Sequence, residues 1–235
     1  MCTVTYIPAT KNNFILTSSR DVPFAREKAL FPKEYIDDNI KITYPKDGRA
    51  GGTWIGYSEK KRLICLLNGG FKNHYLTTDP NSKYRKSRGL IVLDLLKMTE
   101  INSALSEINL TQIEPFTIVI VDWNTDLQLT ELVWDGTKKH IKKLPQKKHI
   151  WSSATLYDDT MKALRESWFN ESKTYNAKSV LNFHHHAGIG DCNVDVIMKR
   201  EKVGTVSITQ VTKLEDKITM NYEDIKPKPL KKLQA

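Results

Sequence analysis

The sequence predicts an α+β protein in which strands and helices form separate layers of one domain. Strand-like and helix-like segments come in blocks, in the order strands, helices, strands, helices, strands, with no internal repeat and no low-complexity linker. Alternating βαβ units would imply a parallel sheet, so this segregation favours antiparallel sheets. With 235 residues, 40% of them apolar, the chain can bury one substantial core. We expect a single domain over residues 1–225, followed by a basic tail over residues 226–235.

The first part of the chain is predicted to form two hairpins. β-branched runs at residues 3–7 and 14–18 flank a polar turn, and a second pair of runs at 53–57 and 63–67 flanks another. Residues 26–49, which carry proline, glycine and mixed charge, are expected to form a long surface excursion.

Periodicity predicts the remaining elements. Helical spacing indicates helices over residues 86–98, 100–108, 158–169 and 177–185, with Thr99 as the cap of the second. Strands are predicted over residues 116–123, 128–134, 140–144, 193–198, 205–211 and 217–222.

Cys2 is the most informative position for function. Methionine aminopeptidase removes Met1 when the next side chain is small, and removal leaves a thiol and a free α-amine on one residue. An N-terminal nucleophile needs this pair, because the amine can accept the proton that the attacking sulfur loses. The amine titrates at about 7.7 to 8.0 and an ordinary thiol at about 8.5, so the two are well matched near neutral pH. The alternative is that Met-Cys is an ordinary chain start.

Composition narrows the classes of protein. No run reaches the roughly 18 apolar residues of a membrane span, and the N-terminus does not resemble a signal peptide, so we expect a cytoplasmic protein without stable membrane insertion. The three cysteines, Cys2, Cys65 and Cys192, are too widely spaced for a disulfide scaffold or a Cys-rich zinc site. We expect no metal and no cofactor. Cys65, in an apolar run, is expected to be an inert core thiol.

The formal charge of +9 is concentrated in residues 138–149 and 226–232. A nucleic-acid groove usually interleaves cations with stacking aromatics, and these two segments contain none. A solvated basic face is favoured, and no nucleic-acid partner is expected. Nothing in these patterns indicates an oligomeric state.

Four short motifs together resemble the NRDE family, also called the transport-and-Golgi-organisation-2 type. They are Met1-Cys2, Ser19-Arg20-Asp21-Val22, Gly51-Gly52-Thr53-Trp54-Ile55-Gly56 and Leu67-Asn68-Gly69-Gly70. The resemblance is sharp over residues 1 to about 71. It implies an N-terminal-nucleophile hydrolase fold, a four-layer αββα sandwich of two antiparallel sheets.

Arg20 and Asp21 are candidate site residues beside Cys2. Arg20 is a permanent cation on a strand expected to pair with the strand that Cys2 opens, where it could favour the thiolate or bind an anionic substrate group. Asp21 could orient the α-amine only if the chain turns or bulges there, as Pro23 suggests. A surface ion pair is the alternative for both residues.

Asn68 ends an apolar strand and precedes two glycines, so its amide is suited to hold a developing oxyanion. A turn-closing asparagine is the alternative. The related cholylglycine hydrolases use an asparagine at the comparable place. Ser153 stands where the resembled family often has a second amide, and Trp54 lies in the glycine-rich motif, so both are candidates for substrate contact, with a core role as the alternative for Trp54.

The resemblance implies a cysteine amidohydrolase or acyl-transfer enzyme acting on a small non-peptide amide, with Cys2 as nucleophile. The chain departs from the family pattern at Val22 and Ser153, and a late arginine expected before residue 193 is missing. The alternative is therefore a non-catalytic protein that binds haem or a lipid-like ligand in the same pocket. The run His184 to His186 offers weak candidate ligands for haem or a metal.

Overall fold

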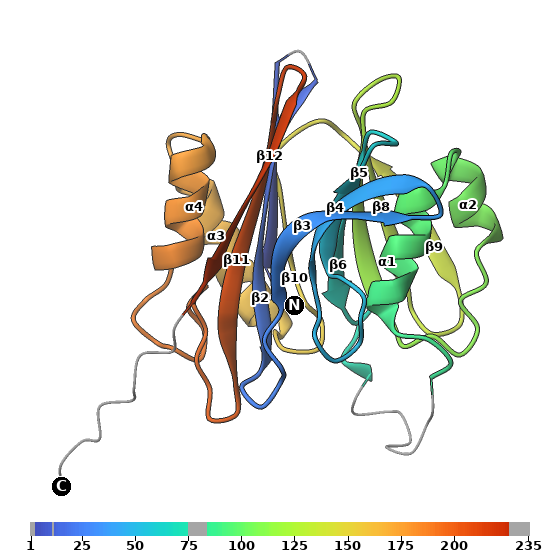
Figure 1. Cartoon of the computed structure of the whole chain (residues 1–235). Coiled ribbons are helices and arrows are strands. Elements are labelled where there is room, and N and C mark those ends of the chain that lie inside the picture. The colour runs from blue at the N-terminus through green and yellow to red at the C-terminus, as the bar shows by residue number, and fades with distance from the viewer. Residues whose placement is uncertain (1–2, 11, 75–83, 226–235) are drawn as a thin grey trace, which may run out of the picture.

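The computed structural model describes residues 3–10, 12–74 and 84–225, which form a four-layer αββα sandwich (Figure 1). Two antiparallel sheets face each other, and one pair of helices covers the outer side of each sheet. The predicted α+β class and its layering are confirmed. The basic segment 226–235 lies outside the described residues.

The first sheet has five strands in the order β10-β1-β2-β11-β12, and every neighbouring pair is antiparallel. Its strands are β1 (Thr3–Ala9), β2 (Asn13–Pro23), β10 (His149–Ser152), β11 (Val203–Leu214) and β12 (Lys217–Asp224). The hairpin predicted between β1 and β2 is confirmed, whereas the short strand β10 was not predicted. Within this sheet, Thr3 of β1 pairs with Ser19 of β2 on one side and with Ser152 of β10 on the other.

The strand predicted over residues 193–198 is wrong, because the chain forms a turn there. The Asp191 carbonyl accepts hydrogen bonds from the backbone N–H groups of Val194 and Asp195. The Asp191 side chain also accepts the Asn193 N–H at 2.9 Å. Such local side-chain bonds compete with a sheet ladder and favour a turn.

The second sheet has seven strands in the order β3-β4-β5-β6-β7-β8-β9. Its strands are β3 (Leu30–Asp37), β4 (Ile40–Lys46), β5 (Ile55–Ser58), β6 (Arg62–Asn68), β7 (Phe116–Asp122), β8 (Gln128–Trp134) and β9 (Lys139–Leu144). The surface excursion predicted over residues 26–49 is wrong, because these residues form the β3–β4 hairpin. Asp38 and Asn39 make its turn with φ of 50° and 61°, a conformation that asparagine and aspartate tolerate. The edge strand β3 is largely exposed, so it lacks the apolar alternation that would have predicted it.

The helices are α1 (Arg88–Lys97), α2 (Ile101–Glu107), α3 (Asp159–Asn170) and α4 (Ala177–His186). All four were predicted within a few residues of these bounds. The predicted cap Thr99 is wrong, because α2 begins after Glu100 and no side chain caps it. Helix α3 begins after Asp158, whose side chain accepts the Met161 N–H at 2.8 Å.

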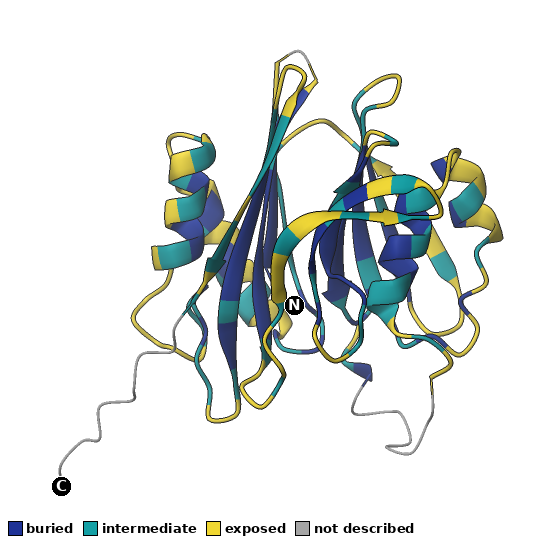
Figure 2. Cartoon of the chain, in the orientation of Figure 1, coloured by how far each residue is buried: buried dark blue, intermediate teal, exposed yellow. Residues whose placement is uncertain are grey.

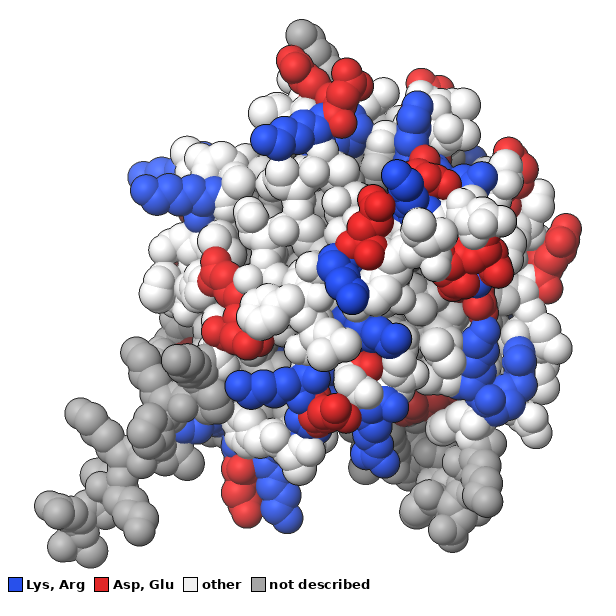
Figure 3. Space-filling model, viewed as in Figure 1, with Lys and Arg blue, Asp and Glu red and all other residues white. Residues whose placement is uncertain are grey.

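Buried residues concentrate on the facing strands of the two sheets and on the inner sides of the helices (Figure 2). Cys65 is fully buried in this core, and burial raises the pKa of its thiol to about 12, as an inert thiol requires. Lys and Arg are interspersed with Asp and Glu on the face that carries β3, β11 and β12 (Figure 3). None of the helices in the described part is both long and apolar enough to cross a membrane.

Candidate functional site

Arg20 lies near the end of β2 with its side chain almost completely buried. Its Nη2 donates a 2.5 Å hydrogen bond to Oδ2 of Asp47. The Trp54 ring covers the guanidinium, whose central carbon is 4.1 Å from the ring centroid. Burial lowers the pKa of Arg20 below its ordinary value, and the charge of Asp47 opposes that change. Arginine titrates so high that the group stays charged at neutral pH. The alternative of a surface ion pair between Arg20 and Asp21 is wrong, because both side chains are buried and Arg20 pairs with Asp47.

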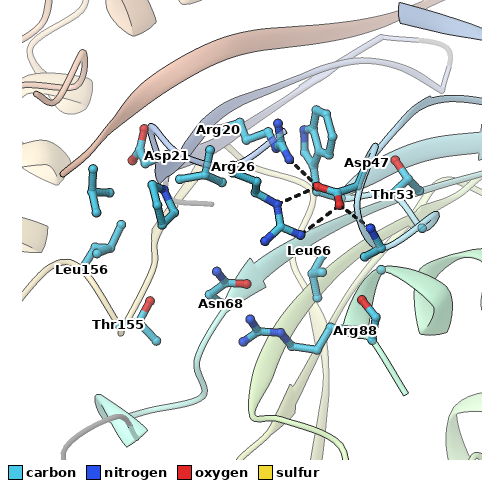
Figure 4. Close-up of a pocket in the computed structure, with 18 residues that line it drawn as sticks. Arg20, Asp21, Arg26, Asp47, Thr53, Leu66, Asn68, Arg88, Thr155 and Leu156 are labelled. Carbon is cyan, nitrogen blue, oxygen red and sulfur yellow. Dashed lines mark hydrogen bonds and ion pairs between the residues drawn. The ribbon is translucent and has the colours of Figure 1, made fainter. Parts of the chain in front are cut away.

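Asp47, which the sequence did not single out, joins two arginines across the sandwich. Its carboxylate accepts Nε and Nη2 of Arg26 at 2.8 and 2.9 Å, in addition to Arg20. The Ala50 N–H donates to the same carboxylate at 2.8 Å. The backbone of the glycine-rich motif holds this loop, because the Asp47 N–H donates to the Gly52 carbonyl. Figure 4 shows Arg20 and Arg26 converging on Asp47.

Asp21 follows Arg20 on the same strand and is also buried. Its two carboxylate oxygens accept hydrogen bonds from the hydroxyls of Tyr157 and Thr205, both at 2.6 Å. The ladder between β2 and β11 shifts register here, because Thr205 pairs with Asp21 whereas Ser207 pairs with Arg20. The irregularity anticipated near Asp21 therefore lies on the partner strand β11. A bulge re-aims side chains, and Arg20 and Asp21 line the same cavity although they are consecutive residues.

Asn68 ends β6 and also borders this cavity (Figure 4). Its side-chain amide has no hydrogen-bond partner among the described residues. Its backbone carbonyl accepts a 2.8 Å bond from the Ser153 hydroxyl, which also bonds to Thr155 at 2.9 Å. Ser153 is buried and does not line the cavity. The structure therefore places Ser153 as a support for Asn68, and not at the cavity surface.

The cavity has a volume of about 370 Å³ and opens between the ends of β2 and β6. Four of the expected site residues, Arg20, Asp21, Trp54 and Asn68, border it. It also has apolar walls and two further arginines, contributed by Val22, Pro23, Leu66, Leu156, Val203, Arg26 and Arg88. The Arg88 guanidinium is paired with protein groups, since it donates to Glu114 at 2.9 Å and to the Pro115 carbonyl at 3.0 Å.

Met1 and Cys2 lie outside the described residues, so the first described residue of β1 is Thr3. Thr3 is fully buried between β2 and β10, and its hydroxyl accepts a hydrogen bond from Arg165. The Arg165 guanidinium also stacks on the Tyr157 ring, 3.6 Å from its centroid. Arg165 thus supports both the start of β1 and the tyrosine that binds Asp21.

Sequence reasoning missed Asp47, Tyr157, Arg165 and Thr205. Only Arg165 carried a recognisable signal, because it lies four residues from both Met161 and Phe169 on α3. An arginine at that spacing falls on the inward face of an amphipathic helix. The other three are single polar residues without motif or spacing to distinguish them.

The histidine run does not converge on the cavity. His184 is fully buried on α4, with Nε2 2.9 Å from the Thr5 hydroxyl and Nδ1 2.7 Å from the Ser19 hydroxyl. His185 pairs with Glu223 at 2.8 Å, and His186 is exposed. Across residues 3–10, 12–74 and 84–225, no group of three or more His, Cys, Asp or Glu side chains could hold a metal ion.

Comparison with solved structures shows which fold this is. A Caenorhabditis elegans N-acylethanolamine-hydrolyzing acid amidase ortholog superposes with a TM-score of 0.63 at 12% identity, covering 89% of this chain and 92% of that chain. A variant of the conjugated bile acid hydrolase from Clostridium perfringens gives a TM-score of 0.52 at 10% identity, covering 96% and 92% of the two chains. At these identities the likeness shows the fold, which is that of the N-terminal-nucleophile hydrolases.

No curated protein matches the sequence. Residues 1–221 match the family described as Transport and Golgi organisation 2. The match covers nearly the whole chain, including the four motifs that suggested the resemblance. This chain therefore belongs to the Transport and Golgi organisation 2 family.

Proposed function

We propose that this protein is an N-terminal cysteine amidohydrolase, or a related acyl-transfer enzyme, that acts on a small non-peptide amide. Cys2 is the nucleophile after removal of Met1. The observation that carries the proposal is the meeting of Arg20, Asp21 and Asn68 at one cavity, next to Ser19, which pairs with Thr3. The fold, shared with an acid amidase ortholog, supports the same reaction class.

Each group has a role in the proposed reaction. The Cys2 thiol gives its proton to its own α-amine, and the sulfur attacks the amide carbon of the substrate. The carbonyl oxygen becomes an oxyanion that accepts a hydrogen bond from the Asn68 amide. The α-amine then passes this proton to the substrate nitrogen, which leaves as an amine. Water hydrolyses the thioester, which releases the acid and restores the thiol.

Asp21 is proposed to orient the α-amine that acts as the base. Its carboxylate is held by Tyr157 and Thr205, and the buried Arg165 supports that tyrosine. A base that is fixed in this way needs no rearrangement when the proton moves.

Turnover of a panel of N-acyl amides, followed by mass spectrometry of the released amine, tests the proposal. The wild-type protein is expected to release amine from at least one member, and Cys2→Ala is expected to release none. Intact mass should show loss of Met1 and, early in turnover, a thioester adduct on the wild-type chain. A functional protein that retains Met1 would contradict the proposal, because the base would then be an amide nitrogen. Absence of turnover together with haem binding would favour the non-catalytic alternative.

Asn68→Ala separates the oxyanion role from a structural one. Removing one oxyanion donor costs about 100-fold to 1,000-fold in kcat. We expect a loss of that order with little change in KM. Asn182→Ala is the matched control, because this asparagine is exposed on α4, away from the cavity.

A further inference from the structure

Two fully buried arginines show how this protein satisfies a guanidinium outside the cavity. Arg62 donates from all three nitrogens, to Asp122 and to the carbonyls of Leu95, Met98 and Thr99. Arg165 also donates from all three, to the Thr3 hydroxyl and to the carbonyls of Val194 and Asp195. These contacts follow the rule that buried polar groups find partners.

Arg20 departs from this rule. Its side chain is 3% exposed, yet only Nη2 donates, to Asp47. For Nε and Nη1, the described part of the chain supplies no acceptor. The Trp54 ring lies over the guanidinium face and does not accept the N–H groups in its plane. Because Arg20 borders the cavity, a bound ligand can supply the missing acceptors.

The neighbouring carboxylate cannot satisfy these donors. Asp47 already accepts four N–H groups, one from Arg20, two from Arg26 and one from Ala50, which fills the lone-pair sites of a carboxylate.

We propose that Arg20 binds a carboxylate of the ligand, so that the substrate is an amide that carries a free carboxylate, such as an N-acyl amino acid. A carboxylate pairs with two parallel N–H groups on one edge of a guanidinium, as Asp47 pairs with Nε and Nη2 of Arg26. On Arg20, a ligand carboxylate can pair in this way with Nη1 or Nε together with the second N–H of Nη2. The apolar walls formed by Leu66, Leu156 and Val203 accommodate the remainder of a small molecule. The amide part of this assignment rests on the proposed function, whereas the carboxylate part rests on Arg20.

Calorimetric titration of the Cys2→Ala protein with two probes tests the assignment without turnover. N-hexanoylglycine carries the carboxylate, and N-hexanoylglycinamide is its neutral counterpart. A charge-assisted hydrogen bond in a buried site predicts that the anion binds about tenfold tighter or more. Equal affinities for the two probes, or tighter binding of the neutral one, would overturn the proposal.

Arg20 variants locate the preference. Arg20→Met in the same background should bind the two probes equally. Arg62→Met is the matched control, because it removes a buried, ion-paired arginine that does not line the cavity, and the anion preference should persist. If Arg20→Met does not fold, Arg20→Lys keeps the charge without the planar fork and should reduce the preference. A full preference in a folded Arg20 variant would contradict the assignment.

The same probes distinguish failure of the assignment from failure of the proposed function. An anion preference in Cys2→Ala with no turnover of any amide by the wild type would retain the carboxylate site and reject the enzyme. Wild-type turnover of both probes with equal kcat/KM would retain the enzyme and reject the carboxylate site.

Discussion

At the scale of single residues, Asp47 organises one wall of the cavity, because its carboxylate accepts hydrogen bonds from both Arg20 and Arg26. Burial acts to raise the pKa of Asp47, but hydrogen bonds from Arg26 and Ala50 and the charges of both arginines outweigh it and hold the pKa below its usual value. The carboxylate is therefore ionised at neutral pH. Its contribution to stability is present above the unfolded pKa of about 4 and is lost as the pH falls through the lower folded value.

Asp47→Asn should destabilise the fold, because it leaves the buried Arg20 without its counter-charge. Removing one partner of a buried pair costs about 3 to 5 kcal/mol, and the partial exposure of Arg26 favours the lower end. Urea unfolding at pH 7 measures the change. Asp38→Asn is the control, because Asp38 is 75% exposed in its pair with Lys97 and should cost less than about 1 kcal/mol. Equal losses in the two variants would contradict a structural role for the Asp47 cluster.

His184 gives the stability a specific pH dependence. Burial and the nearby charges of Arg165 and His185 lower the pKa of His184 to about 3, from an ordinary value near 6.5. Between these values the unfolded chain binds a proton at His184 and the folded chain does not. The neutral His184 therefore causes no loss in the free energy of unfolding above about pH 6.5, and this free energy falls as the pH drops toward 3. The slope for one group is about 1.4 kcal/mol per pH unit.

Urea unfolding over pH 3.5 to 7 should therefore give a shallower dependence for His184→Gln than for the wild type. Asn182→Gln should keep the wild-type slope, because it changes an exposed, uncharged side chain on the same helix. A His184→Gln slope equal to that of the wild type would show that this imidazole does not remain neutral in the fold.

The bulge in β11 matters at the scale of elements, because it brings Thr205 opposite Asp21. The Thr205 hydroxyl donates to Asp21 at 2.6 Å and accepts the Met198 N–H at 2.9 Å. It therefore ties β2, β11 and the preceding turn together behind the cavity.

Thr205→Val preserves the shape of the side chain and removes both bonds. We expect a loss of about 1 to 3 kcal/mol in unfolding free energy, the cost of leaving buried polar groups without partners. Thr212→Val, on the same strand, removes one partly buried bond to Thr219 and should cost less. The idea fails if the two substitutions cost the same.

Elements with strong alternation or periodicity could be predicted from the sequence, and the others could not. The β1–β2 and β5–β6 hairpins have apolar runs on both sides of a polar turn, so their residues specify them locally. The exposed edge strand β3 and the four-residue strand β10 carry no such pattern, because pairing with neighbours distant in sequence defines them. The predicted strand over residues 193–198 failed because side-chain hydrogen bonds of Asp191 stabilise a turn.

The residues of the candidate site also fall into those that the sequence could predict and those that it could not. Arg20, Asp21 and Asn68 stand in short motifs at strand ends and could be singled out before the fold was known. Asp47 lies in a turn whose importance depends on Arg20, which is 27 residues away. Arg165 is 162 residues from Thr3, and only the packing of α3 on the first sheet brings them together. Contacts of this kind leave no local signal.

At the scale of the whole molecule, the layered fold buries Cys65 and leaves Cys192 exposed, so the two thiols should differ in reactivity. Cys65 lies fully buried in the core, where burial raises its pKa to about 12, and Cys192 is exposed in the loop before β11. Iodoacetamide at pH 7.5 should therefore label Cys192 in the native protein and Cys65 only after unfolding. Peptide mass spectrometry checks this order, and native labelling of Cys65 would contradict the packing of the two sheets.

The central claim is that Cys2 is an activated nucleophile with a free α-amine. The most direct measurement is the rate of Cys2 carboxymethylation against pH in a Cys192→Ser background, with intact mass to verify that Met1 is absent. The account predicts a half-maximal rate well below pH 8.5, the midpoint of an ordinary thiol. A midpoint at or above 8.5, or a functional protein that keeps Met1, would contradict it.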